Sequence, residues 1–535
     1  MENKMRNKVP LVVALLLPLA LTQMAIATPE RAASFFGFGD GTGSQMGADA
    51  WRGLKSIFKG EDFSYGLPVK IFNRTAKQQH LDRATEWRVF GNLPSPTWRA
   101  APYVTAPLPL GESVFVRSGA AVMNQNCFAC HAGLVAGQVV AGLGNMQVDA
   151  VSFKTQADEL VQKWDRPLGR FELSLLLNRT EMDLLEGYVD YLRSILLPSI
   201  QAKGRGDIHG PWAIWRLISR MKDPAKSLDL YPPDEKAPLE SLLDRQLPPV
   251  RPNPWWRLKY KKRAFWTADV SVHSLPTFAL NLMDPNENNT ETFPARMERT
   301  RLQLEFARQT EAPPFPSRRQ VNRVVSLDGW ALFHGKKPLA DGTTLKCFGC
   351  HGNYSNEGKL EFYPNLDAVD IQTIRTDPAY ATILHDIKPL YEHFGESPFA
   401  PTGIDAVHYP EQIGYVPPPL VGIWASAPYF HNGSVPSVYE VLKSSARPTL
   451  WRKNLDILAY DKEKLGVSRF DITAAEYATL KYNAWMDQDP MSSAALAVRQ
   501  VYDTQDFGKS NTGHPFGDAM TDAERMAVIE YLKLL

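Results

Sequence analysis

The sequence predicts a mainly α-helical protein of two domains with long ordered loops and an N-terminal extension. Three observations support this prediction. Apolar residues recur at helical spacing in several segments, for example from Leu184 to Ile195. The 41 prolines favour long loops over continuous sheet. A chain of 535 residues also exceeds one ordinary hydrophobic core, so two or three domains are expected.

One motif occurs twice and uses every cysteine in the chain. Both copies, at residues 127–131 and 347–351, read Cys-x-x-Cys-His, which is the attachment signal of a c-type haem. The two thiols bond to the porphyrin, and the histidine ligates the iron on the proximal side. The sequence therefore predicts two covalent haems, with attachment by Cys127, Cys130, Cys347 and Cys350 and proximal ligation by His131 and His351.

The alternative for four cysteines is a zinc site built from two Cys-x-x-Cys pairs. About 220 residues separate the two pairs, far more than zinc motifs usually place between them. Zinc would also leave His131 and His351 without a role. The haem interpretation is therefore favoured.

The N-terminus resembles a secretory signal over residues 1–27. A basic start is followed by an apolar run from Leu11 to Leu21 and by a small-x-small site that ends at Ala27. An uncleaved anchor is the alternative, but the run is short for a span of about 20 residues. We expect cleavage after Ala27, a periplasmic or secreted protein without a transmembrane segment in its mature form, and no disulfides.

The charge balance argues against some partners. The formal net charge is +1, and it falls to about −1 once the three basic residues and one acidic residue of the signal are removed. Nothing in this balance points to nucleic acid or to an anionic surface as a partner.

We expect residues 28–310 to form an N-terminal arm and a first haem domain, and residues 311–535 a second haem domain. A charged helix and a proline-marked linker between Arg299 and Arg323 give the boundary. Val114-Phe115 and Leu332-Phe333 lie at similar distances before the two motifs. They suggest a short helix leading into each one, a weak internal repeat.

Three further segments have local signals. Thr180-x-x-Asp183 is a candidate capping box for the helix that runs towards Pro198, and Thr521-x-x-Glu524 one for the C-terminal helix. Residues 224–254 are polar and rich in proline, which favours a loop.

Aromatic residues crowd into residues 255–283, with lysines between them. The simplest interpretation is a half-buried amphipathic segment whose lysines face water. The functional alternative is a wall over a haem or an electron bridge between two haems, for which Trp256, Trp266 and His273 are the candidates. His273 would act as a ligand or proton shuttle, although a core role is commoner for histidine.

A longer pattern follows the second motif. Residues 417–436 contain Pro-x-Leu-x-Gly-x-x-x-x-Ala-Pro-Tyr-x-His-Asn-Gly-Ser. Together with the two haem motifs, it resembles the bacterial di-haem cytochrome c peroxidase superfamily. Within that group the chain is most similar to the di-haem rubber oxygenases and their relatives, because of its length, its long interhaem segment, Trp424 to Val435 and the ending Gly513 to Gly517. The resemblance covers most of the chain from about Val114.

The resemblance implies two cytochrome c-like haem domains with different roles. It gives the N-terminal haem the reaction with peroxide or dioxygen, and the C-terminal haem the storage of an electron. It also implies His514 as the distal ligand of the second iron, with His431 and Met520 as rivals. The alternatives are an exposed loop position for His514 and a structural role for His431 in a tight turn.

The expected function is accordingly that of a peroxidase-like di-haem oxidoreductase, with a small cytochrome or cupredoxin as electron donor. Two alternatives stay open: a dioxygenase that cleaves an apolar substrate such as polyisoprene, and a non-enzymatic electron carrier. Some relatives hold calcium between the haems, but no acidic calcium loop stands out here.

Overall fold

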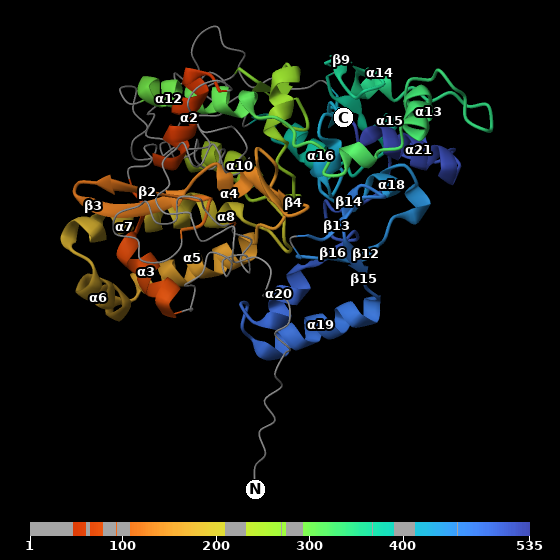
Figure 1. The fold of residues 1–535 in the computed structure, drawn as a ribbon. Helices are drawn as coiled ribbons and strands as arrows, with labels where there is room; N and C mark the ends of the chain where they lie inside the picture. The colour runs from red at the N-terminus through yellow and green to blue at the C-terminus, as the bar shows by residue number, and fades with distance from the viewer. Residues whose placement is uncertain are drawn as a thin grey trace, which may run out of the picture.

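We analysed a computed structural model of the chain (Figure 1), which describes residues 46–59, 65–78, 93, 108–208, 232–268, 270–273, 293–365, 367–389, 412–456 and 458–535. The predicted signal segment lies outside these residues. The fold is mainly α-helical, as predicted. Elements of the N-terminal half gather on one side of Figure 1 and those of the C-terminal half on the other.

The N-terminal half combines helices with short antiparallel sheets. Its helices are α2 (Ala48–Lys59), α3 (Val69–Gln78), α4 (Phe128–His131), α5 (Ala150–Asp165), α6 (Pro167–Leu176), α7 (Arg179–Tyr191), α8 (Leu197–Ser199), α10 (Pro233–Leu243) and α12 (Phe293–Gln309), with a π-helical turn η2 (Leu192–Leu196) and a 3-10 turn η4 (Trp255–Tyr260). Its strands are β1 (Leu67–Pro68), β2 (Glu112–Arg117), β3 (Ala120–Gln125), β4 (Ala132–Val135), β5 (Gln138–Ala141), β6 (Arg263–Ala264) and β7 (Val270–Ser271).

The C-terminal half has the same character. Its helices are α13 (Arg323–Phe333), α14 (Phe348–His351), α15 (Ile371–Ile374), α16 (Ala379–Asp386), α18 (Val438–Val441), α19 (Ala474–Asp487), α20 (Ser493–Arg499) and α21 (Asp522–Leu532), with the 3-10 turns η5 (Arg318–Gln320), η6 (Ile423–Ser426), η7 (Ser444–Ala446) and η8 (Pro515–Gly517). Its strands are β8 (Asn353–Tyr354), β9 (Leu360–Phe362), β10 (Val369–Asp370), β11 (Gly414–Tyr415), β12 (Leu450–Lys453), β13 (Tyr460–Asp461), β14 (Gly466–Val467), β15 (Arg469–Asp471) and β16 (Val501–Asp503).

One close helix pair stabilises each half. In the N-terminal half α12 packs along α2, where a Cβ on Gly53 would lie 1.9 Å from the carbonyl oxygen of Leu302. In the C-terminal half α13 packs along α21, where a Cβ on Gly329 would lie 1.9 Å from the carbonyl oxygen of Ala527. Glycine at these crossings lets the backbones approach more closely than any side chain would allow.

The segment before the first motif is a hairpin, and the predicted helix at Val114-Phe115 is wrong. Strand β2 pairs with β3, which also pairs with β1. The turn at Ser118-Gly119 has positive φ at both residues, as a tight hairpin requires, and β-branched residues alternate with others along β2. Before the second motif, Leu332-Phe333 does end a helix, α13. The expected internal repeat is therefore absent from the structure of these two segments.

The hydrophobic cores cross the predicted domain boundary. The largest core cluster joins residues of the C-terminal half to Val135, Val140, Leu143 and Trp256 from the N-terminal half. A second cluster joins Ile195 and Leu243 to Tyr380 and Tyr415. The two halves therefore bury apolar surface against each other, which fixes the two motifs relative to one another.

Local predictions had mixed outcomes. The capping box of the C-terminal helix is confirmed, but the cap of α7 is Asn178 with Glu181, two residues earlier than predicted. The asparagine has the extended backbone that a cap requires. Residues 224–254 include the helix α10, which begins at Pro233 with two acidic residues in its first turn.

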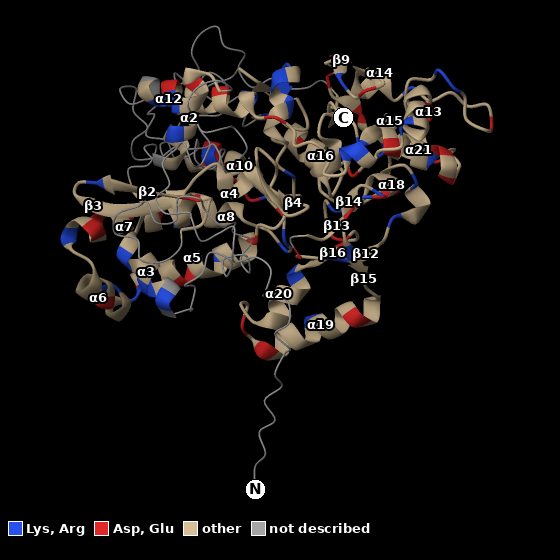
Figure 2. Cartoon of the chain, viewed as in Figure 1, with Lys and Arg blue, Asp and Glu red and all other residues tan. Residues whose placement is uncertain are grey.

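The charge distribution is mixed. Acidic and basic side chains alternate over elements of both halves (Figure 2). Within the described residues, no helix combines the length and the hydropathy that a membrane span requires.

Candidate functional site

The second motif forms a single helical turn. The amides of Cys350 and His351 both donate to the carbonyl of Cys347, at 3.2 and 3.0 Å. Gly352 follows with a φ of +100°, and a Cβ there would lie 2.8 Å from the carbonyl oxygen of Phe362. This short turn brings both thiols and the imidazole together, as covalent attachment of one porphyrin requires.

The His351 imidazole has a defined orientation. Its Nδ1 lies 2.9 Å from the carbonyl oxygen of Pro418. Removal from water lowers the pKa of His351, so the ring is neutral at pH 7. A neutral ring that donates Nδ1–H to a carbonyl keeps its Nε2 lone pair free for a metal.

His514 faces His351. The two ring centres are 6.2 Å apart and the ring planes are inclined by 51°. A metal ion between the two rings would form two bonds to nitrogen of about 2 Å each. The rest of the 6.2 Å, roughly 2 Å, is about twice the distance from a nitrogen to the centre of its imidazole ring. Burial, with His351 and Arg447 nearby, lowers the pKa of His514 to about 3, so this ring is also neutral. The pair fits the two axial ligands of one haem iron.

The loop that carries His514 is tightly held. The backbone amide of His514 donates to the carbonyl of Ile374 at 2.6 Å. A Cβ on Gly513 would lie 2.2 Å from the carbonyl carbon of Arg375, and Gly513 has a φ of +83°. Nη1 of Arg447 donates to the carbonyls of Asn511 and Gly513, each at 2.7 Å. His514 itself has a φ of +50°, a conformation that non-glycine residues adopt at some cost.

The first motif, in α4, has a different environment. The Asn126 side chain accepts from the amide of Phe128 at 2.9 Å and begins the turn. The buried Phe128 ring packs against Phe58, Trp255 and Phe306. The His131 ring stacks on Trp255, with centres 5.0 Å apart and planes inclined by 26°.

The two proximal candidates differ in their hydrogen bonds. Nδ1 of His131 is buried and has no hydrogen-bond partner among the described residues, whereas Nδ1 of His351 is bonded to Pro418. Removal from water lowers the pKa of His131 to about 4, so this ring is neutral and its lone pairs are available. Across the described part of the chain, the ring contact of His131 is with Trp255, and no second histidine faces it as His514 faces His351.

The four cysteine side chains are partly buried. Burial raises the pKa of both Cys130 and Cys347 to about 11, so the thiolate forms are scarce at neutral pH. Over the described ranges, no group of three or more His, Cys, Asp or Glu side chains converges to hold a metal ion.

Adjacent tryptophans connect the two sites. Trp255 stacks on His131, and its neighbour Trp256 is fully buried in the core shared with the C-terminal half. Nε1 of Trp256 donates to the carbonyl of Val421 at 2.9 Å. Val421 lies three residues from Pro418, the partner of His351. Trp255 belongs to the aromatic stretch predicted as a possible wall over a haem, but the bridge candidates predicted there were Trp256 and Trp266.

The other candidates lie elsewhere. Trp266 donates from Nε1 to the carbonyl of Arg251 at 2.7 Å. It also packs against the second core cluster, which joins Ile195 and Leu243 to Tyr380 and Tyr415. His273 is exposed, and its Nδ1 lies 3.0 Å from a guanidinium nitrogen of Arg308, which does not favour a place over a haem. His431 is buried and stacks on Tyr415 with ring centres 4.0 Å apart. This contact favours the structural role for His431.

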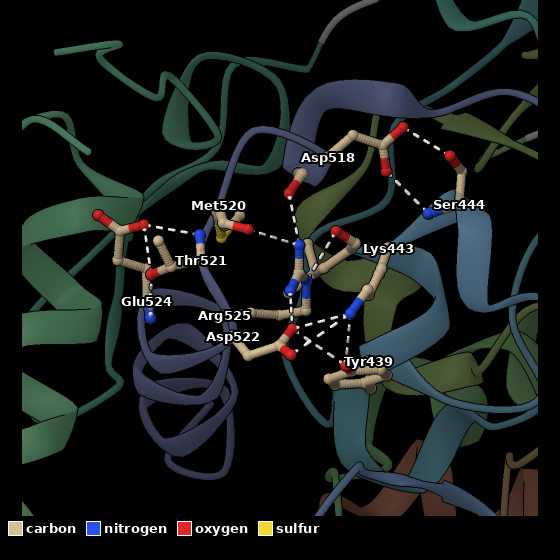
Figure 3. A network of polar contacts seen from close by, with 11 residues as sticks. Tyr439, Lys443, Ser444, Asp518, Met520, Thr521, Asp522, Glu524 and Arg525 are labelled. Carbon is tan, nitrogen blue, oxygen red and sulfur yellow. Dashed lines mark hydrogen bonds and ion pairs between the residues drawn. The ribbon is translucent and has the colours of Figure 1, made fainter. Parts of the chain in front are cut away.

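Met520 lies in the core, two residues before the C-terminal helix begins at Asp522. Figure 3 shows its carbonyl accepting from Arg525, at 2.8 Å, beside the Thr521–Glu524 capping box. The Met520 side chain belongs to the main core cluster. His514, not Met520, is the candidate whose ring faces His351.

Comparisons with known proteins support a cytochrome. Residues 414–452 match a family model described as RoxA-like, cytochrome c-like. This range includes Pro418 and Val421, the partners of His351 and Trp256. The match supports the rubber-oxygenase-like branch of the resemblance, and it implies a c-type haem and a haem-dependent oxidoreductase or oxygenase.

Two curated proteins of Sinorhizobium fredii (strain NBRC 101917 / NGR234) are also similar. The uncharacterized protein y4iJ is 26% identical over 276 residues, which are 41% of each chain. The uncharacterized protein y4iM is 42% identical over 109 residues, which are 20% of each chain. The matches therefore span less than half the length of these relatives.

Proposed function

We propose that the chain is a periplasmic or secreted di-haem c-type oxidoreductase. Its N-terminal haem, on His131, reacts with peroxide or dioxygen, and its C-terminal haem, on His351 and His514, stores and relays an electron. The observation that carries this proposal is the facing pair His351 and His514 beside a Cys-x-x-Cys-His turn. An iron with two protein ligands transfers electrons, whereas one with an open position binds an oxidant.

The protein side chains give the two sites unequal properties. The bond from His351 to Pro418 orients its ring and makes it a stronger electron donor to the iron. His131 has no such partner in the described part of the chain and packs against Trp255. Trp255 and Trp256 supply the route between the sites, because one contacts His131 and the other the segment that binds His351.

A peroxidase-like reaction and an oxygenase reaction are the two candidates. The match to a RoxA-like domain favours the oxygenase, and with it an apolar substrate such as polyisoprene. A pure electron carrier would need a second axial ligand on both irons. A location outside the cytoplasmic membrane agrees with covalent haem and with the signal-like residues 1–27.

The test has two steps on the full-length protein. A pyridine haemochrome assay should give two haems per chain, and one in each variant that replaces one cysteine pair with alanine. Absorbance of the half-reduced protein is then followed after addition of hydrogen peroxide or of dioxygen. Reaction with peroxide alone supports the peroxidase, and reaction with dioxygen the oxygenase. No reaction with either would overturn both in favour of the carrier.

A further inference from the structure

Two buried arginines meet at the interface between the halves. Arg251 and Arg257 are 4% and 3% exposed, and both come from the N-terminal half. They converge on Ser426 of η6: Arg251 donates to its carbonyl, and Nη2 of Arg257 donates to its hydroxyl at 3.0 Å. Nε of Arg257 also reaches the carbonyl of Val421, at 3.4 Å.

Neither guanidinium has an anionic partner within the described residues. In the part of the chain that the structure describes, their hydrogen bonds go to Val421 and Ser426 and not to a carboxylate. Beyond burial, the charged group that most affects Arg251 is Arg257. Nε of Arg251 is buried without a hydrogen-bond partner. Burial and this mutual repulsion lower the pKa of Arg251 to about 9.

Other buried arginines of the same interface are paired differently. Arg499, 6% exposed, binds the Asp149 carboxylate at 3.0 Å and Ser152 at 2.8 Å. Arg205 also lies 3.9 Å from Asp149. Burying like charges near each other without a counter-ion is unfavourable, so a pair such as Arg251 and Arg257 calls for an anion from outside the protein chain.

The position of the pair indicates which anion. Nε of Arg257 reaches the carbonyl of Val421, three residues after Pro418, whose carbonyl lies 2.9 Å from Nδ1 of His351. The arginine pair therefore lies beside the segment that contacts the second motif. A c-type haem carries two carboxylates, and guanidinium groups bind carboxylates with good geometry.

We propose that Arg251 and Arg257 form the binding site for a propionate carboxylate of the C-terminal haem. This inference rests on the proposed function, since it requires a haem on His351. The two cations keep that propionate ionised and raise the reduction potential of its iron, because positive charge favours the reduced form. Ser426 holds both guanidiniums in place, so η6 links the propionate site to the segment that binds His351.

The test uses the full-length holoprotein and three variants: Arg257→Met, Arg257→Lys and, as a matched control, Arg499→Met. Haem content of the unmutated protein is measured first, because absence of the second haem would overturn the proposed function and this assignment with it. With both haems present, a negative result for the Arg257 variants overturns this assignment alone. We expect Arg257→Met to lower the potential of the low-spin haem and to shift its propionate bending band in resonance Raman spectra. Arg257→Lys should retain most of the potential, and Arg499→Met should leave both readouts unchanged.

Two results would overturn the assignment. One is an unchanged propionate band in Arg257→Met, because a bare cation near the iron would alter the potential alone. The other is a shift confined to the haem on His131. If Arg257→Met does not fold, the Raman spectrum of the unmutated protein decides the matter, because a propionate band at the frequency of a free, solvated carboxylate contradicts the proposed binding.

Discussion

The imidazole rings of His351 and His514 lie 6.2 Å apart, although 163 positions separate the two residues in the sequence. One ring belongs to a Cys-x-x-Cys-His turn, and the other to a loop held by Arg447 and by backbone contacts with Ile374 and Arg375. The two proposed ligands of the second iron thus come from two elements whose approach depends on the packing of the C-terminal half.

Replacement of His514 by alanine should convert the second haem from low spin to high spin. The reason is loss of one of two axial nitrogens, and added imidazole should restore the low-spin absorbance. The His273→Ala variant, which alters an exposed histidine, serves as the control and should keep the low-spin spectrum. If instead Met520→Leu or His431→Phe abolishes the low-spin state while His514→Ala retains it, the assignment is wrong.

The Gly513→Ala change should weaken the same site without touching a ligand. Its Cβ would meet the backbone of Arg375 at 2.2 Å, which displaces the loop that carries His514. Gly342→Ala is a matched control, because Gly342 has a similar φ of +85° but open space around the added Cβ. Both variants should lose about 1 kcal/mol of unfolding free energy from backbone strain, and only Gly513→Ala should show a high-spin fraction in its absorbance spectrum.

The tryptophan pair should control electron exchange between the haems. Trp255→Phe and Trp256→Phe are each expected to slow the redistribution of an electron after photolysis of carbon monoxide from the half-reduced protein. Trp256→Phe should also cost about 1 kcal/mol in chemical denaturation, because the buried Val421 carbonyl loses the shorter of its two donors and keeps Nε of Arg257 at 3.4 Å. Equal exchange rates in these variants and in Trp485→Phe, which changes an exposed residue of α19, would exclude the route.

Stability should depend on pH through Glu112, in the hairpin before the first motif. Burial raises the pKa of this carboxyl from 4.5 to about 8. The folded state therefore binds a proton that the unfolded state has released, and stability falls as the pH rises from about 4.5 to 8. In Glu112→Gln this fall should be smaller by roughly 1–3 kcal/mol, measured by urea denaturation across that range. An identical slope in both proteins would show that Glu112 ionises normally.

The sequence was informative where chemistry fixes the residues. The two Cys-x-x-Cys-His motifs, the helix before the second one and the cap of α21 follow from local pattern. The hairpin before the first motif was missed, because two apolar residues fit a helix as well as a strand, and the turn at Ser118-Gly119 decides between them.

Contacts between distant segments were beyond local pattern. The indole ring of Trp256 packs against the start of η6, where its Nε1 donates to the carbonyl of Val421. Gly422 leaves room for the ring, because a Cβ there would lie 2.9 Å from the indole nitrogen. His273 and His431 carry the same chemistry as His514, yet one is exposed and the other stacks on Tyr415. Only the packing of the two halves distinguishes these three histidines. The packing of the two halves also brings Arg251 and Arg257 together at Ser426.

We propose that the two haems have unlike coordination, one closed by His351 and His514 and the other open. The most direct measurement is electron paramagnetic resonance of the protein, oxidised and half-reduced, before and after addition of peroxide or dioxygen. We predict a low-spin signal from the C-terminal haem, present in the oxidised protein and lost in His514→Ala. We also predict an N-terminal haem whose spectrum changes with peroxide or dioxygen. Two low-spin haems that ignore both oxidants in both redox states would contradict this account and identify the protein as an electron carrier.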